Sequence, residues 1–173
     1  DQGAQFLSSS YSSLIPLIKE LGLGNYLVEV SPCNGLVRNG KVHRIQPDNP
    51  FTLLTEGVLS WGEWLRFVWN GMKSMWSIRG CKNGEYSSWH MFDDQDAAEW
   101  IEARFGNQAK DSLFEPFFQG LYFQPLEGMS RAFVLAIIAL SRSKPKTMVL
   151  KGGMKLLAEA LEMKLRPEIV LNA

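Results

Sequence analysis

The sequence predicts an α+β protein that is mainly helical and has a small antiparallel sheet. Several segments repeat apolar residues at the three- and four-residue spacing of a helix, and an Asn-Gly pair between β-prone segments predicts a hairpin. Of the 173 residues, 46% are hydrophobic, which is enough for a sizeable core. Six tryptophans and ten phenylalanines indicate an aromatic core, an apolar cavity or a partner surface.

The composition argues against several kinds of function. Lys plus Arg and Asp plus Glu number 18 each, so no basic field points to nucleic acid. The two histidines lie far apart, and Cys33 and Cys81 form no CxxC pair, so we expect no metal site and two free thiols. The longest apolar run, residues 132–140, is too short to span a membrane. These features favour a cytoplasmic protein, although the chain does not begin with Met, which leaves room for a targeting segment before Asp1.

The first elements are predicted to be a helix, a strand and a hairpin. Residues 11–21 carry one apolar helical face, and Ser8 to Ser10 offer hydroxyl N-caps to that helix. Residues 26–30 are typical of a strand. Residues 36–45 are expected to form a hairpin, because Asn39-Gly40 supplies the two positive-φ positions of a type I′ turn.

A longer helix is predicted over residues 61–76, with Ser60 as its N-cap. Phe67 and Trp69 fall outside its main apolar face, so the helix is apolar on more than one side. Burial on two faces is the simpler interpretation. The alternatives are that the second face lines an apolar cavity or touches a membrane surface. The main face comprises Trp61, Trp64, Leu65, Val68, Met72, Met75 and Trp76.

Three further helices are predicted in the second half of the chain. The first is capped by Asp96 and ends at Gly106. The next covers residues 107–122 and contains Pro116, which should kink it. The aromatic residues after the kink are candidates for a cavity wall, with ordinary core packing as the equal alternative. A third, buried helix is expected over residues 131–140.

Residues 147–173 are expected to form a strand, a glycine turn, an amphipathic helix, a proline turn and a second strand at residues 169–171. Gly152-Gly153 before the helix could offer N–H groups to an anion, but a tight turn is favoured. The chain has no GxGxxG, P-loop, GxSxG or HExxH motif. The residues alone therefore leave two classes open: the substrate domain of an enzyme, or a binding module with an apolar pocket.

The order of the segments adds a resemblance that covers nearly the whole chain. The motifs that carry it are Asp1-x-Gly3-Ala4-Gln5, Glu20 to Leu23, Leu36 to Lys41, Asn49-Pro50, Leu59-Ser60, Ala98 to Trp100, Arg104 to Gly106, Gly120 to Tyr122, Gly152 to Met154 and Ile169 to Asn172. Loose motifs follow one another as in the flavin-containing amine oxidase superfamily, and the sequence is most similar to its protoporphyrinogen oxidase-like branch. Phe123-Gln124-Pro125 stands where that branch usually has Gly-Asp, so a porphyrinogen, a carotenoid-like polyene and an amine all stay open as substrates.

The resemblance implies an FAD-dependent oxidoreductase that transfers a hydride from a substrate carbon or C–N bond to the flavin N5. It places Gly3, Ala4 and Gln5 near the flavin ring. It requires no catalytic acid–base residue and no metal. The apolar helix faces supply the candidates for the wall of a hydrophobic or aromatic substrate site, which are Trp64, Trp69, Phe117, Phe118 and Tyr122.

The same resemblance implies a domain organisation. The chain is expected to be one substrate-binding domain over residues 1–173, excised from a two-domain protein, with residues 1–7 and 147–173 as stumps of a missing FAD-binding domain. That domain would be its main partner, and the isolated chain should bind FAD poorly and be inactive. The competing hypothesis is a stand-alone, non-enzymatic module for an apolar ligand or a partner protein. Peripheral membrane contact through residues 61–76 is a further expectation.

Overall fold

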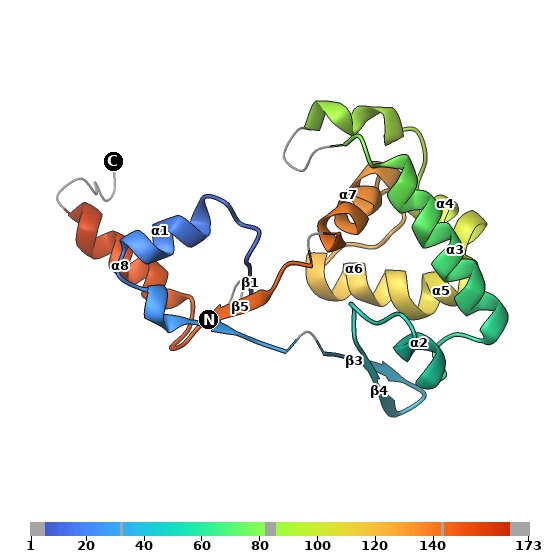
Figure 1. Cartoon of the computed structure of the whole chain (residues 1–173), viewed down its shortest axis with the longest axis horizontal. Coiled ribbons are helices and arrows are strands. Elements are labelled where there is room, and N and C mark those ends of the chain that lie inside the picture. The colour runs from blue at the N-terminus through green and yellow to red at the C-terminus, as the bar shows by residue number, and fades with distance from the viewer. Residues whose placement is uncertain (1–5, 32, 82–85, 143, 167–173) are drawn as a thin grey trace. The chain divides into compact units, whose positions relative to one another are not determined.

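The computed structural model describes residues 6–31, 33–81, 86–142 and 144–166. Their backbone forms two compact units, which we call the terminal unit (Asp1–Pro32 with Pro145–Ala173) and the central unit (Cys33–Lys144) (Figure 1). Helices dominate and both sheets are small and antiparallel, which confirms the predicted α+β class. The terminal unit joins residues 1–32 with residues 145–173, because strand pairing ties these two chain segments together.

The terminal unit is built on a three-stranded antiparallel sheet with β5 in the centre. Its small core contains Leu7, Ile18 and Leu150, one residue from each of β1, α1 and β5. Burial of these three side chains holds the helix against the sheet. The elements are β1 (Leu7–Ser8), α1 (Leu14–Glu20), the 3-10 helix η1 (Gly24–Tyr26), β2 (Leu27–Glu29), β5 (Thr147–Leu150) and α8 (Lys155–Leu165).

The start of α1 differs from the prediction. The helix begins at Leu14, and its N-cap residue Ser13 makes no side-chain cap bond. The expected caps Ser8 to Ser10 serve the sheet instead, since Ser8 lies in β1 and Ser9 Oγ accepts a hydrogen bond from the Lys146 N–H (2.9 Å). A hydroxyl can cap a helix only if the helix follows it directly, and here a turn, closed by the Tyr11 N–H and the Ser8 carbonyl (3.1 Å), comes before α1.

The glycine turn before α8 is formed as expected. Gly152 and Gly153 have φ of 100° and 95°, which favours glycine at both positions. A Cβ at Gly152 would lie 2.9 Å from Leu156 Cδ1, so the turn also packs closely on the helix. The second strand predicted at residues 169–171 lies outside the described residues.

The central unit begins with the predicted hairpin of β3 (Asn34–Arg38) and β4 (Lys41–Ile45). Asn39-Gly40 has φ of 51° and 73°, as a type I′ turn requires. Val37 pairs with Val42 across the two strands, which is the register that a two-residue turn at Asn39-Gly40 sets.

Helices form the rest of the central unit. They are α2 (Thr52–Thr55), α3 (Trp61–Ser77), the 3-10 helices η2 (Tyr86–Ser88) and η3 (His90–Phe92), α4 (Ala97–Phe105), α5 (Asn107–Ala109), the π-helical turn η4 (Lys110–Phe114), α6 (Glu115–Tyr122) and α7 (Arg131–Ser141). Ser60 and Glu63 form a reciprocal capping box at the start of α3, which confirms Ser60 as the N-cap. Asp96 caps α4 as predicted, and Ser130 caps α7.

The helix predicted over residues 107–122 is interrupted just before Pro116. Residues 110–114 form the π-helical turn, and α6 starts at Glu115 with Pro116 in its first turn. Proline lacks the N–H that would bond to the carbonyl four residues earlier, so a wider turn ahead of it leaves less unsatisfied backbone. The expected kink is therefore a local change of helical pitch, and it sets the direction of the side chains that follow.

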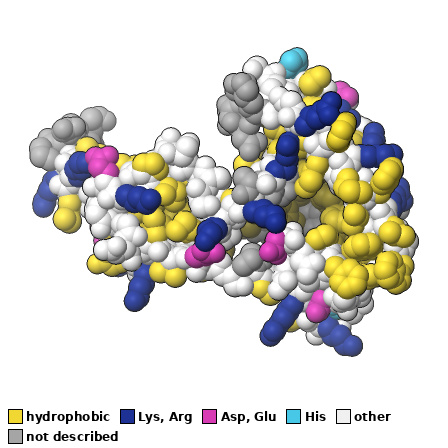
Figure 2. All heavy atoms as spheres, viewed as in Figure 1, with side chains coloured by type: hydrophobic (Ala, Val, Ile, Leu, Met, Phe, Trp, Pro, Cys, Tyr) yellow, Lys and Arg dark blue, Asp and Glu magenta, His cyan; other side chains and the backbone are white. Residues whose placement is uncertain are grey.

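The core of the central unit is aromatic, as the composition suggested. Trp100 and Phe105 are 4% and 1% exposed, and their rings lie 5.6 Å apart. Phe67 on α3 and Phe114 on η4 extend this packing, with ring centroids 5.7 Å and 5.0 Å from Phe105. Phe67 thus faces inward from α3, and Figure 2 shows other hydrophobic side chains gathered on the outer surface over α3.

Two kinds of site are missing from the part of the chain that the structure describes. None of its helices is long and apolar enough to cross a membrane. Its His, Cys, Asp and Glu side chains also form no group of three or more that could hold a metal ion.

Candidate substrate-binding surfaces

Three of the predicted substrate-wall residues come together on α6. The rings of Phe118 and Tyr122 stack with centroids 5.6 Å apart, and Phe117 packs edge-on against Phe118 at 5.3 Å. Phe133 on α7 completes the group, with its ring 5.2 Å from Tyr122. We call Phe117, Phe118, Tyr122 and Phe133 the α6–α7 cluster.

The α6–α7 cluster has a buried side and an open side. Phe118 is 1% exposed, whereas Phe117 is 40% and Phe133 is 38% exposed. Leu121, one turn beyond Phe117, and Phe123 at the end of α6 are also exposed and apolar. A rigid aromatic surface backed by the core can bind a flat apolar ligand.

The other two predicted residues lie on α3. Trp64 is half-buried, its Nε1 donates to the Pro50 carbonyl (2.8 Å), and its ring packs edge-on against Phe51 and Trp61. Trp69 is exposed, with Lys73 Nζ 5.0 Å from its ring centroid. The structure thus distributes the five predicted wall residues over two helices, two on α3 and three on α6.

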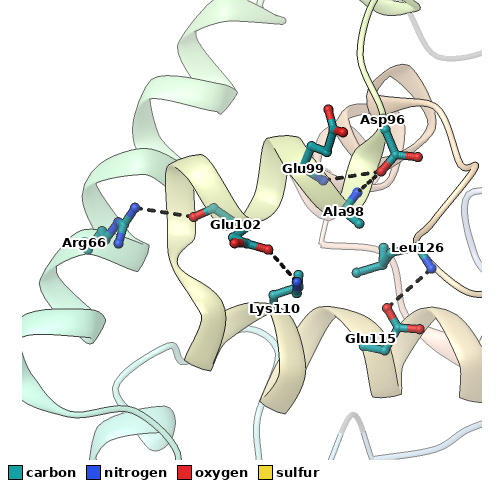
Figure 3. Close-up of polar contacts among 8 residues, drawn as sticks. All are labelled: Arg66, Asp96, Ala98, Glu99, Glu102, Lys110, Glu115 and Leu126. Carbon is teal, nitrogen blue, oxygen red and sulfur yellow. Dashed lines mark hydrogen bonds and ion pairs between the residues drawn. The ribbon is translucent and has the colours of Figure 1, made fainter.

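A polar hollow lies at the C-terminal end of α4. Arg66 reaches from α3 across this helix end and donates to the carbonyl oxygens of Ala103 (2.8 Å) and Arg104 (2.9 Å), with a longer bond to that of Glu102 (3.4 Å) (Figure 3). The last carbonyls of a helix have no partner within the helix, and a cation there complements the helix dipole. The guanidinium is therefore a helix cap. The hollow, about 450 Å³, is lined by Arg66, Glu99, Glu102, Ala103, Gly106 and Asn107.

Gly106 makes the Arg66 cap sterically possible. Its φ of 90° favours glycine, and a Cβ at this position would lie 2.9 Å from Arg66 Nη1. On the same helix, Glu102 forms an ion pair with Lys110 (2.6 Å), and this hydrogen bond raises the pKa of the Lys110 ammonium. At this end of α4, Glu102 and Lys110 are thus paired with each other, and Arg66 is bound to the backbone.

Asp96 fixes the loop before α7 to the start of α4. Its carboxylate accepts hydrogen bonds from the N–H groups of Ala98 (2.8 Å) and Glu99 (3.3 Å) (Figure 3). It also accepts one from the N–H of Gly128 (2.6 Å). Partial burial opposes the charged form, but the three N–H donors from Gly128, Glu99 and Ala98 together outweigh it and lower the pKa of Asp96. A carboxylate that is held ionised in this way serves as a cap and not as an acid–base group.

The described residues provide no built site for a flavin. Gly3, Ala4 and Gln5, which the resemblance places near the flavin ring, lie outside them. The hollow at α4 is lined by the carboxylates Glu99 and Glu102, which repel the diphosphate of a dinucleotide. No step of flavin chemistry is therefore assigned to the described residues.

Comparison with known proteins decides the family. The sequence profile described as Flavin containing amine oxidoreductase matches residues 1–173. The chain belongs to this family. Among curated proteins none matches. A crystal structure of a candidate protoporphyrinogen oxidase from Exiguobacterium sp. 255-15 has a similar fold, with a TM-score of 0.59 and 17% identity over 93% of this chain and 38% of that chain.

Membership in the flavin-containing amine oxidoreductase family confirms the resemblance found in the sequence. The structural match at 17% identity concerns the fold alone, and the chain spans about two fifths of the length of that protein. Sequence reasoning missed Phe133 and Arg66. Phe133 stands in the first turn of α7, but no sequence signal pairs that helix with α6. Arg66 has no sequence signal, since its partners are backbone carbonyls more than 35 residues away.

Proposed function

We propose that this chain is the substrate-binding part of an FAD-dependent oxidoreductase that transfers a hydride from its substrate to the flavin. The observation that carries the proposal is the family match over residues 1–173. The chain covers 38% of the related oxidase structure, so in this proposal the nucleotide-binding part of the flavin site lies in residues outside this sequence.

The central unit supplies the substrate surface in this proposal. A hydrophobic, conjugated substrate would pack on Phe117, Tyr122 and Phe133, with Phe118 holding these rings in place from the core. The flavin is the hydride acceptor when it is bound. The aromatic side chains bind and orient the substrate and keep water away from it, and no protein acid–base group is required.

The test uses the full-length protein that contains this chain. We expect flavin bands in its visible spectrum, and anaerobic bleaching of those bands by one of three substrate classes: a porphyrinogen, a polyene or an amine. Phe117→Ala should raise KM for that substrate and leave the flavin bands unchanged. Phe51→Ala, a similarly exposed phenylalanine near α3, is the matched control.

The possible results test the flavin-dependent reaction and the substrate surface separately. A full-length protein without flavin bands refutes the oxidoreductase. If the protein has flavin bands but KM is equal in Phe117→Ala and Phe51→Ala, the proposed reaction stands. The α6–α7 cluster is then refuted as the substrate surface.

A stand-alone module for an apolar ligand is the second candidate. The exposed aromatic surface and the absence of a built flavin site among the described residues favour it. The gene separates the two candidates. A GxGxxG motif within about 60 residues upstream of Asp1, the usual span of a βαβ unit and its linker, supports the enzyme. A native start codon close to Asp1 supports the module.

A further inference from the structure

The outer face of α3 carries an unbroken row of exposed apolar side chains. The row repeats at intervals of four, four, three and four residues, which places its members on one side of a helix. At a rise of about 1.5 Å per residue it is roughly 22 Å long. We call it the α3 stripe, and its members with their exposed fractions are Trp61 (61%), Leu65 (57%), Trp69 (57%), Met72 (53%) and Trp76 (69%).

The α3 stripe contributes little to the fold of the central unit. The inner face of α3 holds the helix in the fold, through the buried Ser74 and through Phe67, which packs on Phe105 and Phe114. An aromatic side chain offers about 150–250 Å² of surface, so the three tryptophans alone leave roughly 300–450 Å² exposed. Such a patch is as large as the largest one on a typical monomer and marks an interaction site.

The charges beside the α3 stripe are positive. Lys73 Nζ lies 5.0 Å from the Trp69 ring, and the Arg79 guanidinium carbon lies 4.4 Å from the Trp76 ring. The single acidic residue of α3, Glu63, is held in the capping box with Ser60. The charged heads of Lys73 and Arg79 therefore lie over indole rings of the α3 stripe, so positive charge and apolar surface share this face of the protein.

These charges select among the surfaces that could cover the α3 stripe. A second copy of the stripe would bring Lys73 and Arg79 against like charges, which costs association energy. An anionic lipid surface complements both the cations and the apolar row, because its headgroups attract the cations and its acyl chains accept the indole rings. Tryptophan is also the side chain that best suits the boundary between water and acyl chains.

We propose that α3 lies flat in the headgroup region of an anionic lipid bilayer, with the α3 stripe directed toward the acyl chains. The inference rests on α3 alone and is independent of the proposed enzymatic function. The opposite face of α3 packs on the core of the central unit through Phe67, which keeps the helix at the surface of the bilayer. The protein would then bind reversibly to membranes that contain acidic phospholipids.

The experiment is sedimentation of the full-length protein with phosphatidylcholine vesicles, with and without phosphatidylserine. We expect binding that requires phosphatidylserine and quenching of tryptophan fluorescence by phosphatidylcholine brominated on its acyl chains. The double variant W69S/W76S should lower the vesicle partition coefficient by about tenfold or more. K73E/R79E should lower it by about fivefold for each positive charge lost, and by more through the new negative charges.

The matched control is Phe123→Ser, which removes an aromatic ring that is 87% exposed but does not belong to α3. It should leave the partition coefficient unchanged, and circular dichroism should show that all variants keep their helices. The proposal is overturned if the protein does not bind the vesicles, or if W69S/W76S binds as Phe123→Ser does. A concentration-dependent dimer that W69S/W76S abolishes, without lipid binding, overturns it too and assigns the stripe to a second copy.

Discussion

The contact between Gly106 and Arg66 gives a stability prediction with a defined sign. In Gly106→Ala, the new Cβ would lie 2.9 Å from Arg66 Nη1, which is closer than carbon and nitrogen normally approach. The backbone at Gly106 also has φ 90° and ψ 162°, a region that is nearly restricted to glycine. The substitution therefore strains the backbone and displaces the arginine that caps α4.

The two costs can be estimated separately. Backbone strain of this kind costs about 1–3 kcal/mol. Arg66→Ala removes the bonds to the Ala103 and Arg104 carbonyls, and for an exposed charged cap we expect about 1–2 kcal/mol. In the double variant the arginine is absent, so the alanine at 106 costs its backbone strain and no clash. The double variant should therefore be more stable than the sum of the single costs predicts, by about 0.5–2 kcal/mol.

Tryptophan fluorescence during urea unfolding is the appropriate assay, because all six tryptophans lie between residues 61 and 100 of the central unit. The free energies of unfolding of the wild type, the two single variants and the double variant form a double-mutant cycle. If the costs of Gly106→Ala and Arg66→Ala add to within about 0.3 kcal/mol, the steric link between them does not exist and the reasoning is refuted.

Three further predictions concern single side chains. Ser60→Ala removes the capping box of α3 and should lower the free energy of unfolding by about 0.5–2 kcal/mol, measured in urea; an unchanged value contradicts the box. The pKa of Asp96 is lowered in the folded state, so its stabilising effect is complete above its ordinary pKa of 3.8 and is lost as the pH falls through the lower, folded value. In Asp96→Asn, the free energy of unfolding should therefore fall less steeply as the pH is lowered through the acid range. An equally steep fall would contradict the stabilising role of the ionised Asp96. Phe118→Ala should cost about 3–5 kcal/mol as a fully buried ring, while Phe123→Ser should stay within about 0.5 kcal/mol; equal costs would show that Phe118 is not packed as described.

The elements that were predictable are those defined by neighbouring residues. The Asn39-Gly40 turn, the Ser60 cap and the Asp96 cap each depend on chemistry within about four residues, and all three are formed as expected. The helix start at Leu14 was not predictable in this way, because Ser9 bonds to Lys146, which is far away in the sequence. Long-range pairing overrode the local capping preference there.

The candidate site, too, was predictable only where residues close in the sequence define it. Helical spacing identified Phe117, Phe118 and Tyr122 as neighbours on one helix, and their rings are in contact. Spacing cannot tell which helices pack together, so the contribution of Phe133 from α7 appeared only in the structure. The same limit explains why Trp64 and Trp69 were grouped with residues that lie on a different helix.

The sheet of the terminal unit has a consequence for the order of folding. β1 and β2 both pair with β5, and the Val30 N–H donates to the Thr147 carbonyl (2.9 Å). The segment that leads into the central unit and the segment that follows it are therefore hydrogen-bonded to each other. At a synthesis rate of about 5–20 residues per second, the ribosome needs roughly 6–22 seconds to make residues 33–144. During that time the first two strands wait for their partner, whereas the central unit can fold as soon as it emerges. A nascent chain stalled before Thr147 would therefore carry a finished central unit beside strands with open edges, which is where a chaperone is expected to bind.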